Sequence, residues 1–195
     1  MRPLPFLKTC CLLTAALLPT WAAAQAAPEP AWVAEARQVA GAVPPRLLAV
    51  LQEELDRSGP EGAVAVCNEK APQMAREASE KSGWAIRRVS LRNRNPKAVP
   101  DTWERGVLEE FDRRAAAGES PASLEKAEIV TDAGKSEYRY MKALPVQQIC
   151  LACHGAQETL SPEVSTKLQT LYPHDKAVGY ALGQIRGAMT IRKAQ

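Results

Sequence analysis

The sequence has few aromatic residues, few histidines and little net charge. Aromatic side chains make up 5% of the 195 residues, and there are 2 histidines. Lys and Arg number 25 against 22 Asp and Glu, a formal charge of +3, which is too small to attract a polyanion. With so few aromatic side chains to stack on bases, we expect no nucleic-acid partner. Ordinary apolar (46%) and charged (24%) contents exclude a collagen-like, low-complexity or wholly disordered chain.

One long apolar run stands at the N-terminus, and no comparable run follows it. Arg2 and Lys8 precede the run CLLTAALLPTWAAA, and Ala24-Gln25-Ala26 places small residues at the two key positions of a cleavage site. A proline and a glutamine make the stretch a poor membrane span, although its length would allow one. We therefore predict a signal peptide over residues 1–26, export to the periplasm, and no membrane span after its removal.

Removal of that peptide would leave three cysteines, Cys67, Cys150 and Cys153. An oxidising compartment makes an odd number notable, because one thiol cannot pair within the chain. Cys67 lies on the apolar face of a predicted amphipathic helix over about 61–81. From this pattern alone it is either an inert buried thiol or a metal ligand.

The hydrophobic pattern places helices first and strands mostly later. Helical spacing predicts a short helix that ends near residue 43, followed by helices over 45–57, 61–81 and 101–117. Pro72 is expected to kink the third of these or to split it in two. The last helix should begin with a capping box made by Asp101 and Glu104.

Strand patterns predict a small antiparallel sheet. The expected strands cover 84–92, 123–131, 135–143 and 185–192. The middle two flank Asp132-Ala133-Gly134 and should form a hairpin, and the last alternates as a half-buried strand does. This order predicts an α+β fold with N-terminal helices, in which a lead-in and helix over 27–58 precede one domain over 59–195.

The segment Cys150-Leu151-Ala152-Cys153-His154 has the C-x-x-C-H spacing of c-type haem attachment. Two thiols on one helical turn can add to the two haem vinyl groups, and the next imidazole then reaches the iron. A thioredoxin-type dithiol should instead follow the first strand of a βαβ unit, and a zinc site would need more ligands at suitable spacing. We predict one covalent haem c, with thioethers at Cys150 and Cys153 and with His154 as the proximal axial ligand.

The other axial position has several candidates on this evidence. His174, Met74, Met141 and Met189 are of the conventional residue types, but each also suits a core or turn position. Cys67 is a further candidate for this position.

Four segments resemble a known family. They are AVAVCNEKAP around Cys67, IRRVSLRNRNPKAVPDTWE, CLACHG and YPHDKAVGYALGQIRGAMTI, which together span roughly residues 60–192. They resemble single-haem c-type cytochromes with a PAS-like fold, formerly a domain of unknown function. The resemblance implies a PAS-like antiparallel sheet with one covalently bound haem c, and a Cys67 thiolate as distal axial ligand opposite His154. One departure is Ala98, where the family usually has Asn after RNPK, and it should affect only loop hydrogen bonds.

Arginines gather in the same segments, and haem propionates need cationic or polar partners. The cluster consists of Arg87, Arg88, Arg92, Arg94 and Arg186. For any one of them, a solvated surface position is the more ordinary explanation. We expect Arg186, before Gly187-Ala188, to contact a propionate.

The sequence therefore predicts an exported monohaem c-type cytochrome that acts in redox sensing and signalling or in single-electron transfer, and not an enzyme. A PAS-like fold with Cys/His ligation resembles a sensor input, yet no kinase, cyclase or methyl-accepting segment follows. We therefore expect a separate redox or signalling protein as partner. The alternatives are a haem enzyme such as a peroxidase, which needs an open iron position with acid–base residues, and a non-haem CxxC thiol redox protein.

Overall fold

The computed structural model describes residues 28–195, so the predicted signal peptide over 1–26 lies outside the described residues. Within that described part, no helix combines the length and the hydropathy that crossing a bilayer requires.

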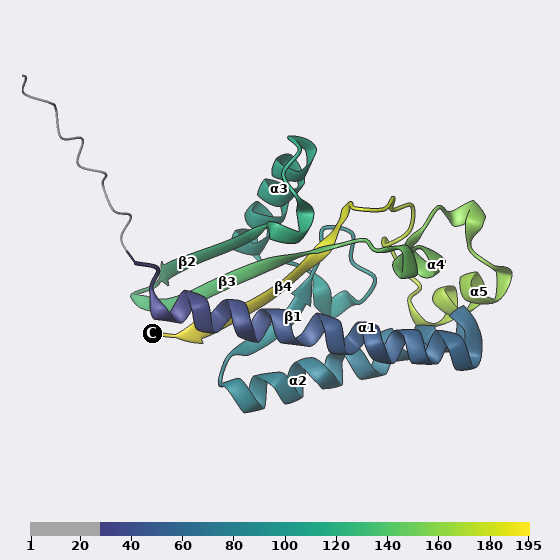
Figure 1. Cartoon of the computed structure of the whole chain (residues 1–195), viewed down its shortest axis with the longest axis horizontal. Helices are drawn as coiled ribbons and strands as arrows, with labels where there is room; N and C mark the ends of the chain where they lie inside the picture. The colour runs from purple at the N-terminus through teal and green to yellow at the C-terminus, as the bar shows by residue number, and fades with distance from the viewer. Residues whose placement is uncertain (1–27) are drawn as a thin grey trace, which may run out of the picture.

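Four antiparallel strands form one sheet in the order β1-β4-β3-β2 (Figure 1). They are β1 (Ala85–Val89), β2 (Glu125–Asp132), β3 (Lys135–Pro145) and β4 (Ile185–Ala194). The predicted hairpin of β2 and β3 is confirmed, with Asp132 paired to Lys135. Positive φ angles at Ala133 (47°) and Gly134 (78°) close its two-residue turn. With helices before and between these strands, the predicted α+β class is confirmed.

The helices differ from the prediction mainly near the N-terminus. The structure has α1 (Ala31–Ala65), a π-helical turn η1 (Val66–Lys70), α2 (Ala71–Ser82), α3 (Thr102–Ala116), α4 (Leu151–His154) and α5 (Pro162–Leu171). The two separate helices expected before residue 58 are wrong, because α1 continues through Pro44 and Pro45. The predicted gap between the helices over 45–57 and 61–81 is a kink inside α1, where Gly59 has a φ of 66°.

Pro72 does not split the predicted helix over 61–81, because the backbone stays right-handed helical from the end of α1 through η1 into α2. Pro72 stands in the first turn of α2. The π-turn η1 comes directly before it. The helix α5 was not predicted, although Ser161 caps it by accepting a hydrogen bond from the Val164 N–H at 3.2 Å.

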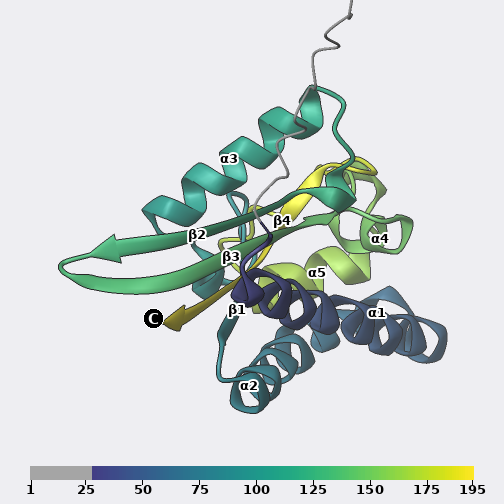
Figure 2. The ribbon, with the colours of Figure 1, turned by 60° about the vertical axis from the view of Figure 1, so that its left-hand side comes forward.

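Helices cover both faces of the sheet (Figure 2). On one face, α1 and α2 pack against the strands around Trp84, Tyr140 and Met189. On the other face, α3 packs through Val107, Leu108 and Phe111. The prediction of a half-buried β4 is therefore wrong, since its residues from 185 to 191 are all buried. A strand between two layers of helices loses its exposed face.

Two local features fix the position of α3 and β4. The predicted capping box is confirmed, because the Glu104 N–H donates to Asp101 Oδ1 (2.9 Å) and the Asp101 N–H to Glu104 Oε2 (2.8 Å). The buried Glu104 carboxylate also accepts a hydrogen bond from Thr190 Oγ1 of β4 at 2.9 Å. Gly187 in β4 has a φ of 153°, and a Cβ there would lie 2.3 Å from the Val89 carbonyl oxygen. Only glycine fits this close approach of β4 to β1.

Candidate functional site

A cavity of about 270 Å³ brings together two residues that are distant in the sequence, Cys67 and His154. Cys67 comes from η1 and His154 from the end of α4. The apolar part of the wall comes from α1, α2 and the sheet, and includes Val43, Leu47 and Met189. The two residues that the sequence analysis proposes as axial ligands therefore border one space.

The π-helical turn η1 positions Cys67. An extra residue in a helical turn changes the direction of the side chains that follow it, and such turns are frequent at functional sites. Tyr172 holds η1 in place by donating its hydroxyl proton to Asn68 Oδ1 at 3.0 Å. Sequence analysis missed this turn, and its one local signal is the helix-breaking Pro72 that follows.

Cys67 is a free, partly buried thiol. Burial raises its pKa, and the positive charges of Arg88, Arg94 and Arg186 act in the opposite direction. The thiolate therefore needs a further positive charge beside it, such as a metal ion, to form at neutral pH.

His154 is buried and held in one tautomer. Its Nδ1 lies 2.6 Å from the Ala177 carbonyl oxygen, which can only accept, so Nδ1 carries the proton and donates it. Nε2 is then left with its lone pair. Burial, reinforced by the charges of Arg186 and Arg94, holds the pKa of His154 well below its usual range. The ring is thus the neutral imidazole, which is the metal-binding form.

The segment after α5 holds His154 from outside. Tyr180 N–H donates to the His154 carbonyl at 2.9 Å, and the Tyr180 ring stands edge-on to the imidazole, with 6.3 Å between ring centroids. Arg94 joins the two segments, because its Nη2 donates to the Cys153 carbonyl at 2.6 Å and its Nε to Asp175 Oδ2 at 2.9 Å. Asp175 Oδ1 in turn accepts from the Ala177 N–H at 2.7 Å.

Sequence analysis missed this positioning role of Asp175 and Ala177. Both lie in the YPHDKAVGY segment, and no local pattern in that segment indicates a contact with the imidazole.

Cys150 and Cys153 lie within one helical turn, immediately before His154. Both are free and partly buried, and neither belongs to the residues that line the cavity. Burial raises the pKa of Cys153 to about 11, and repulsion from thiolate charge at Cys67 and Cys150 adds to the shift. Cys153 packs against the cluster of Val64 and Val164, and Cys150 against that of Val146 and Tyr180.

The polar lining of the cavity is strongly positive. It includes six cationic side chains and no Asp or Glu; the cations are Arg76, Arg87, Arg88, Arg94, Lys97 and Arg186. Of these, Arg87 pairs with Glu104 and Arg94 with Asp175. The remaining excess of positive charge suits a bound group that carries carboxylates.

Arg186 lies against His154. Its Nε is 3.3 Å from Nδ1 and 3.4 Å from Nε2 of the imidazole, so the guanidinium packs on the ring. Its Nη1 donates to Ser90 Oγ (3.0 Å) and to the Arg92 carbonyl (3.2 Å). Burial and the charge of Arg88 lower its pKa, because both disfavour the charged guanidinium. A nearby anion would stabilise that charge. Arg92 is not among the residues that line this cavity.

The conventional candidates for the second axial position are dispersed. Met189 borders the cavity. Met74 does not, and packs against the core cluster that contains Met189. Met141 is buried on the opposite face of the sheet. His174 is exposed in the turn after α5. Over residues 28–195, no group of three or more His, Cys, Asp or Glu side chains is placed to share a metal ion.

Comparison with known proteins identifies relatives of the whole domain. Residues 19–193 match the sequence family described as Tll0287-like. The solved structure described as the cyanobacterial heme-protein Tll0287 superposes with a TM-score of 0.65 at 23% sequence identity. That alignment covers 86% of this chain and 98% of the other. Among proteins of curated function, none matches the sequence.

Proposed function

Since the chain belongs to the Tll0287-like family, we propose that it binds one covalent haem c and works as an exported one-electron redox protein. The observation that carries the proposal is the single cavity bordered by Cys67 and His154, beside the C-x-x-C-H segment. The related solved structure is described as a heme protein, which supports the same cofactor here.

The residues of the site fit a haem in four ways. Cys150 and Cys153 supply two thiols on one turn for the two thioethers. His154 supplies a neutral ring whose Nε2 carries a lone pair, already oriented by the Ala177 carbonyl. Cys67 supplies a thiol that ionises once a positive iron lies beside it. The cationic lining supplies partners for two propionates, and Arg186 is the first of these that we assign.

A bound haem would supply a one-electron Fe(III)/Fe(II) couple at this site. The surrounding chain sets how that couple behaves. A Cys67 thiolate would favour the ferric state and lower the potential of a bound haem, whereas the positive charges of Arg186 and Arg94, which act on both Cys67 and His154, would raise it. We propose that this balance serves redox sensing or the transfer of single electrons to a separate protein partner in the periplasm.

Covalent attachment is the property to test first. The chain, with its signal peptide, is produced in a bacterial host that performs c-type cytochrome maturation, and the periplasmic product is weighed intact. We expect a mass that lacks residues 1–26 and includes one haem, and we expect acid-acetone extraction to leave the haem on the denatured protein. Haem in the organic layer, or a haem-free product, would contradict the proposal.

Two variants separate attachment from ligation. Cys150→Ser leaves one thioether and should shift the reduced absorption band, whereas Cys67→Ser should keep both thioethers and the full mass of one haem. The alternative of a non-haem thiol protein has its own signature. In that case the product carries no haem, and oxidation with diamide joins Cys150 to Cys153 in a disulfide.

A further inference from the structure

One loop, the segment over residues 172–180, contacts the segments that carry both proposed axial ligands. At its start, the Tyr172 hydroxyl donates to Asn68 Oδ1 at 3.0 Å, in the π-turn η1 that carries the proposed distal ligand. Further along it, the Ala177 carbonyl accepts the Nδ1 proton of His154 at 2.6 Å. The loop therefore has one direct contact with each of the two segments.

Hydrogen bonds within the loop connect these two contacts. The Asp175 N–H donates to the Tyr172 carbonyl at 3.0 Å, and Asp175 Oδ1 accepts from the Ala177 N–H at 2.7 Å. Asp175 is itself held by Arg94, with an N–O distance of 2.9 Å. Tyr172 and Ala177 are thus joined through Asp175, so the loop sets the position of one contact relative to the other.

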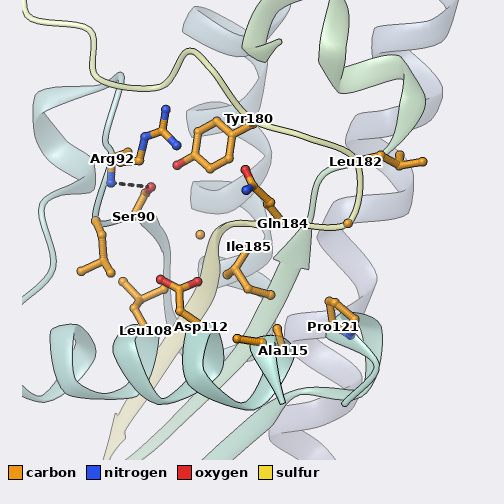
Figure 3. A pocket seen from close by; sticks show the side chains of 14 residues that line it. Ser90, Arg92, Leu108, Asp112, Ala115, Pro121, Tyr180, Leu182, Gln184 and Ile185 are labelled. Atoms are coloured by element: carbon orange, nitrogen blue, oxygen red, sulfur yellow. Dashed lines mark hydrogen bonds between the residues drawn. The ribbon is translucent and has the colours of Figure 1, made fainter. Parts of the chain in front are cut away.

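Arg92 fixes the far end of the loop. Its guanidinium lies 4.0 Å from the centre of the Tyr180 ring, and Figure 3 shows the two side chains next to each other. Its Nε donates to the Lys176 carbonyl at 3.3 Å, and its Nη2 donates to the Val178 carbonyl. Because a fully connected polar network rigidifies the segment that carries it, this loop is a fixed support for Tyr172.

The π-turn is the element that needs such a support. Its Ala71 N–H donates to the Val66 carbonyl, five residues back, whereas an α-helix would use the Cys67 carbonyl. Pro72 has no N–H, and a proline ring crowds the carbonyl four residues before it, here that of Asn68, which favours an extra residue in this turn. If the extra residue moved by one position, the Cys67 side chain would turn by about 100° around the helix axis and leave its place at the cavity.

The Tyr172 ring is anchored independently of its hydroxyl. The residue is 5% exposed, borders the cavity, and packs with Val64 at the end of α1 and with Val164 and Leu168 of α5. The hydroxyl then reaches Asn68, the residue that follows the proposed ligand in the chain. A hydrogen bond from such an anchored ring favours one arrangement of the turn over the others.

From the hydrogen bond between Tyr172 and Asn68, and from the loop that joins it to the contact with His154, we propose that Tyr172 is the positioning residue for Cys67. It keeps the π-turn in the arrangement in which Cys67 borders the cavity. The inference rests on the proposed function, because it concerns the bond of Cys67 to a haem iron. Its consequence is that loss of the hydroxyl weakens this bond and leaves the covalent attachment unchanged.

Free imidazole measures how firmly Cys67 is held, because it can bind on that side of the iron only after Cys67 leaves. Imidazole is titrated into the ferric haem-loaded protein, and the shift of the Soret absorption band gives its apparent Kd. Tyr172→Phe keeps the ring and removes the hydroxyl. Since the net contribution of one hydrogen bond is a factor of about five in an equilibrium constant, imidazole should bind about fivefold more tightly to this variant.

Tyr140→Phe is the matched control. It removes another buried hydroxyl, which donates to Glu125 at 2.6 Å, from a residue that does not border the cavity. Its imidazole affinity should stay within about twofold of that of the natural sequence. Asn68→Ala removes the acceptor instead of the donor, so it should act like Tyr172→Phe, and the two changes together should do no more than either alone. Equal imidazole affinity in Tyr172→Phe and the control would overturn the inference.

Replacing Cys67 separates this inference from the proposed function. Cys67→Ala removes the competing ligand and should tighten imidazole binding, and Tyr172→Phe should then add nothing. If Cys67→Ala leaves the affinity unchanged, Cys67 does not bind the iron, and the proposed ligation is wrong together with this inference. If Cys67→Ala tightens binding and Tyr172→Phe does not, the ligation stands and the positioning role alone is refuted. A gain from Tyr172→Phe in the Cys67→Ala background would show that the hydroxyl controls access to the iron, which also refutes the positioning role.

Discussion

Replacing Asp175 by Asn tests how the structure holds His154. The Arg94–Asp175 pair is buried, with side-chain exposures of 7% and 12% and an N–O distance of 2.9 Å. Removing one partner of a buried ion pair typically costs 3–5 kcal/mol, because the other charge is left uncompensated. An Asn side chain can still accept the Ala177 N–H, so we expect a cost at the lower end, about 3 kcal/mol. For a domain of this size that corresponds to a fall in Tm of about 6–12 °C.

Urea unfolding at pH 7, followed by circular dichroism, measures this cost. The matched control is Glu110→Gln, which removes a carboxylate that pairs with Arg114 and Lys126 at the surface. Such exposed pairs contribute at most about 1 kcal/mol. If Asp175→Asn destabilises the fold no more than the control does, the Arg94–Asp175 pair does not hold the segment around Ala177, and the reasoning is wrong.

Two further changes probe the fold itself. Gly187→Ala should lower the free energy of unfolding by at least about 2 kcal/mol, because the new Cβ would lie 2.3 Å from the Val89 carbonyl oxygen. Gly106→Ala in α3 should raise it by about 0.5–1 kcal/mol, because a Cβ there meets nothing within 4 Å. Equal urea midpoints for the two variants would contradict this. The hydrogen bonds of Arg37 are the main cause that lowers the pKa of Glu125. The ionised Glu125 therefore stabilises the fold fully above the ordinary carboxyl pKa, and this stabilisation is lost as the pH falls through the lowered pKa. Glu125→Gln should therefore reduce the loss of stability below about pH 4.5. If urea unfolding shows the same dependence of stability on acid pH in the variant and the natural sequence, the Arg37–Glu125 pair does not stabilise the fold.

The features that sequence could predict depend on neighbouring residues. The C-x-x-C-H spacing, the capping box of Asp101 and Glu104, and the hairpin turn at Ala133-Gly134 are each specified within a few positions. The resemblance predicted that Cys67 lies near His154, and the two residues line one cavity.

The features that sequence could not predict depend on packing. Ala36 and Ala40 are fully buried under the sheet, and this burial holds α1 together through Pro44-Pro45 despite the missing backbone donors. The alternating pattern of β4 indicated one exposed face, but α3 covers it. The tautomer of His154 is set by a carbonyl 23 positions away, which no local pattern can reveal.

The most direct test of the central claim is the ferric electron paramagnetic resonance spectrum of the haem-loaded protein, recorded for the natural sequence, Cys67→Ala and Met189→Leu. Cys67 and Met189 both border the cavity, but we assign only Cys67 to the iron. We therefore expect a low-spin thiolate signal that disappears in Cys67→Ala and persists in Met189→Leu. A spectrum unchanged in Cys67→Ala, or lost in Met189→Leu, would contradict it.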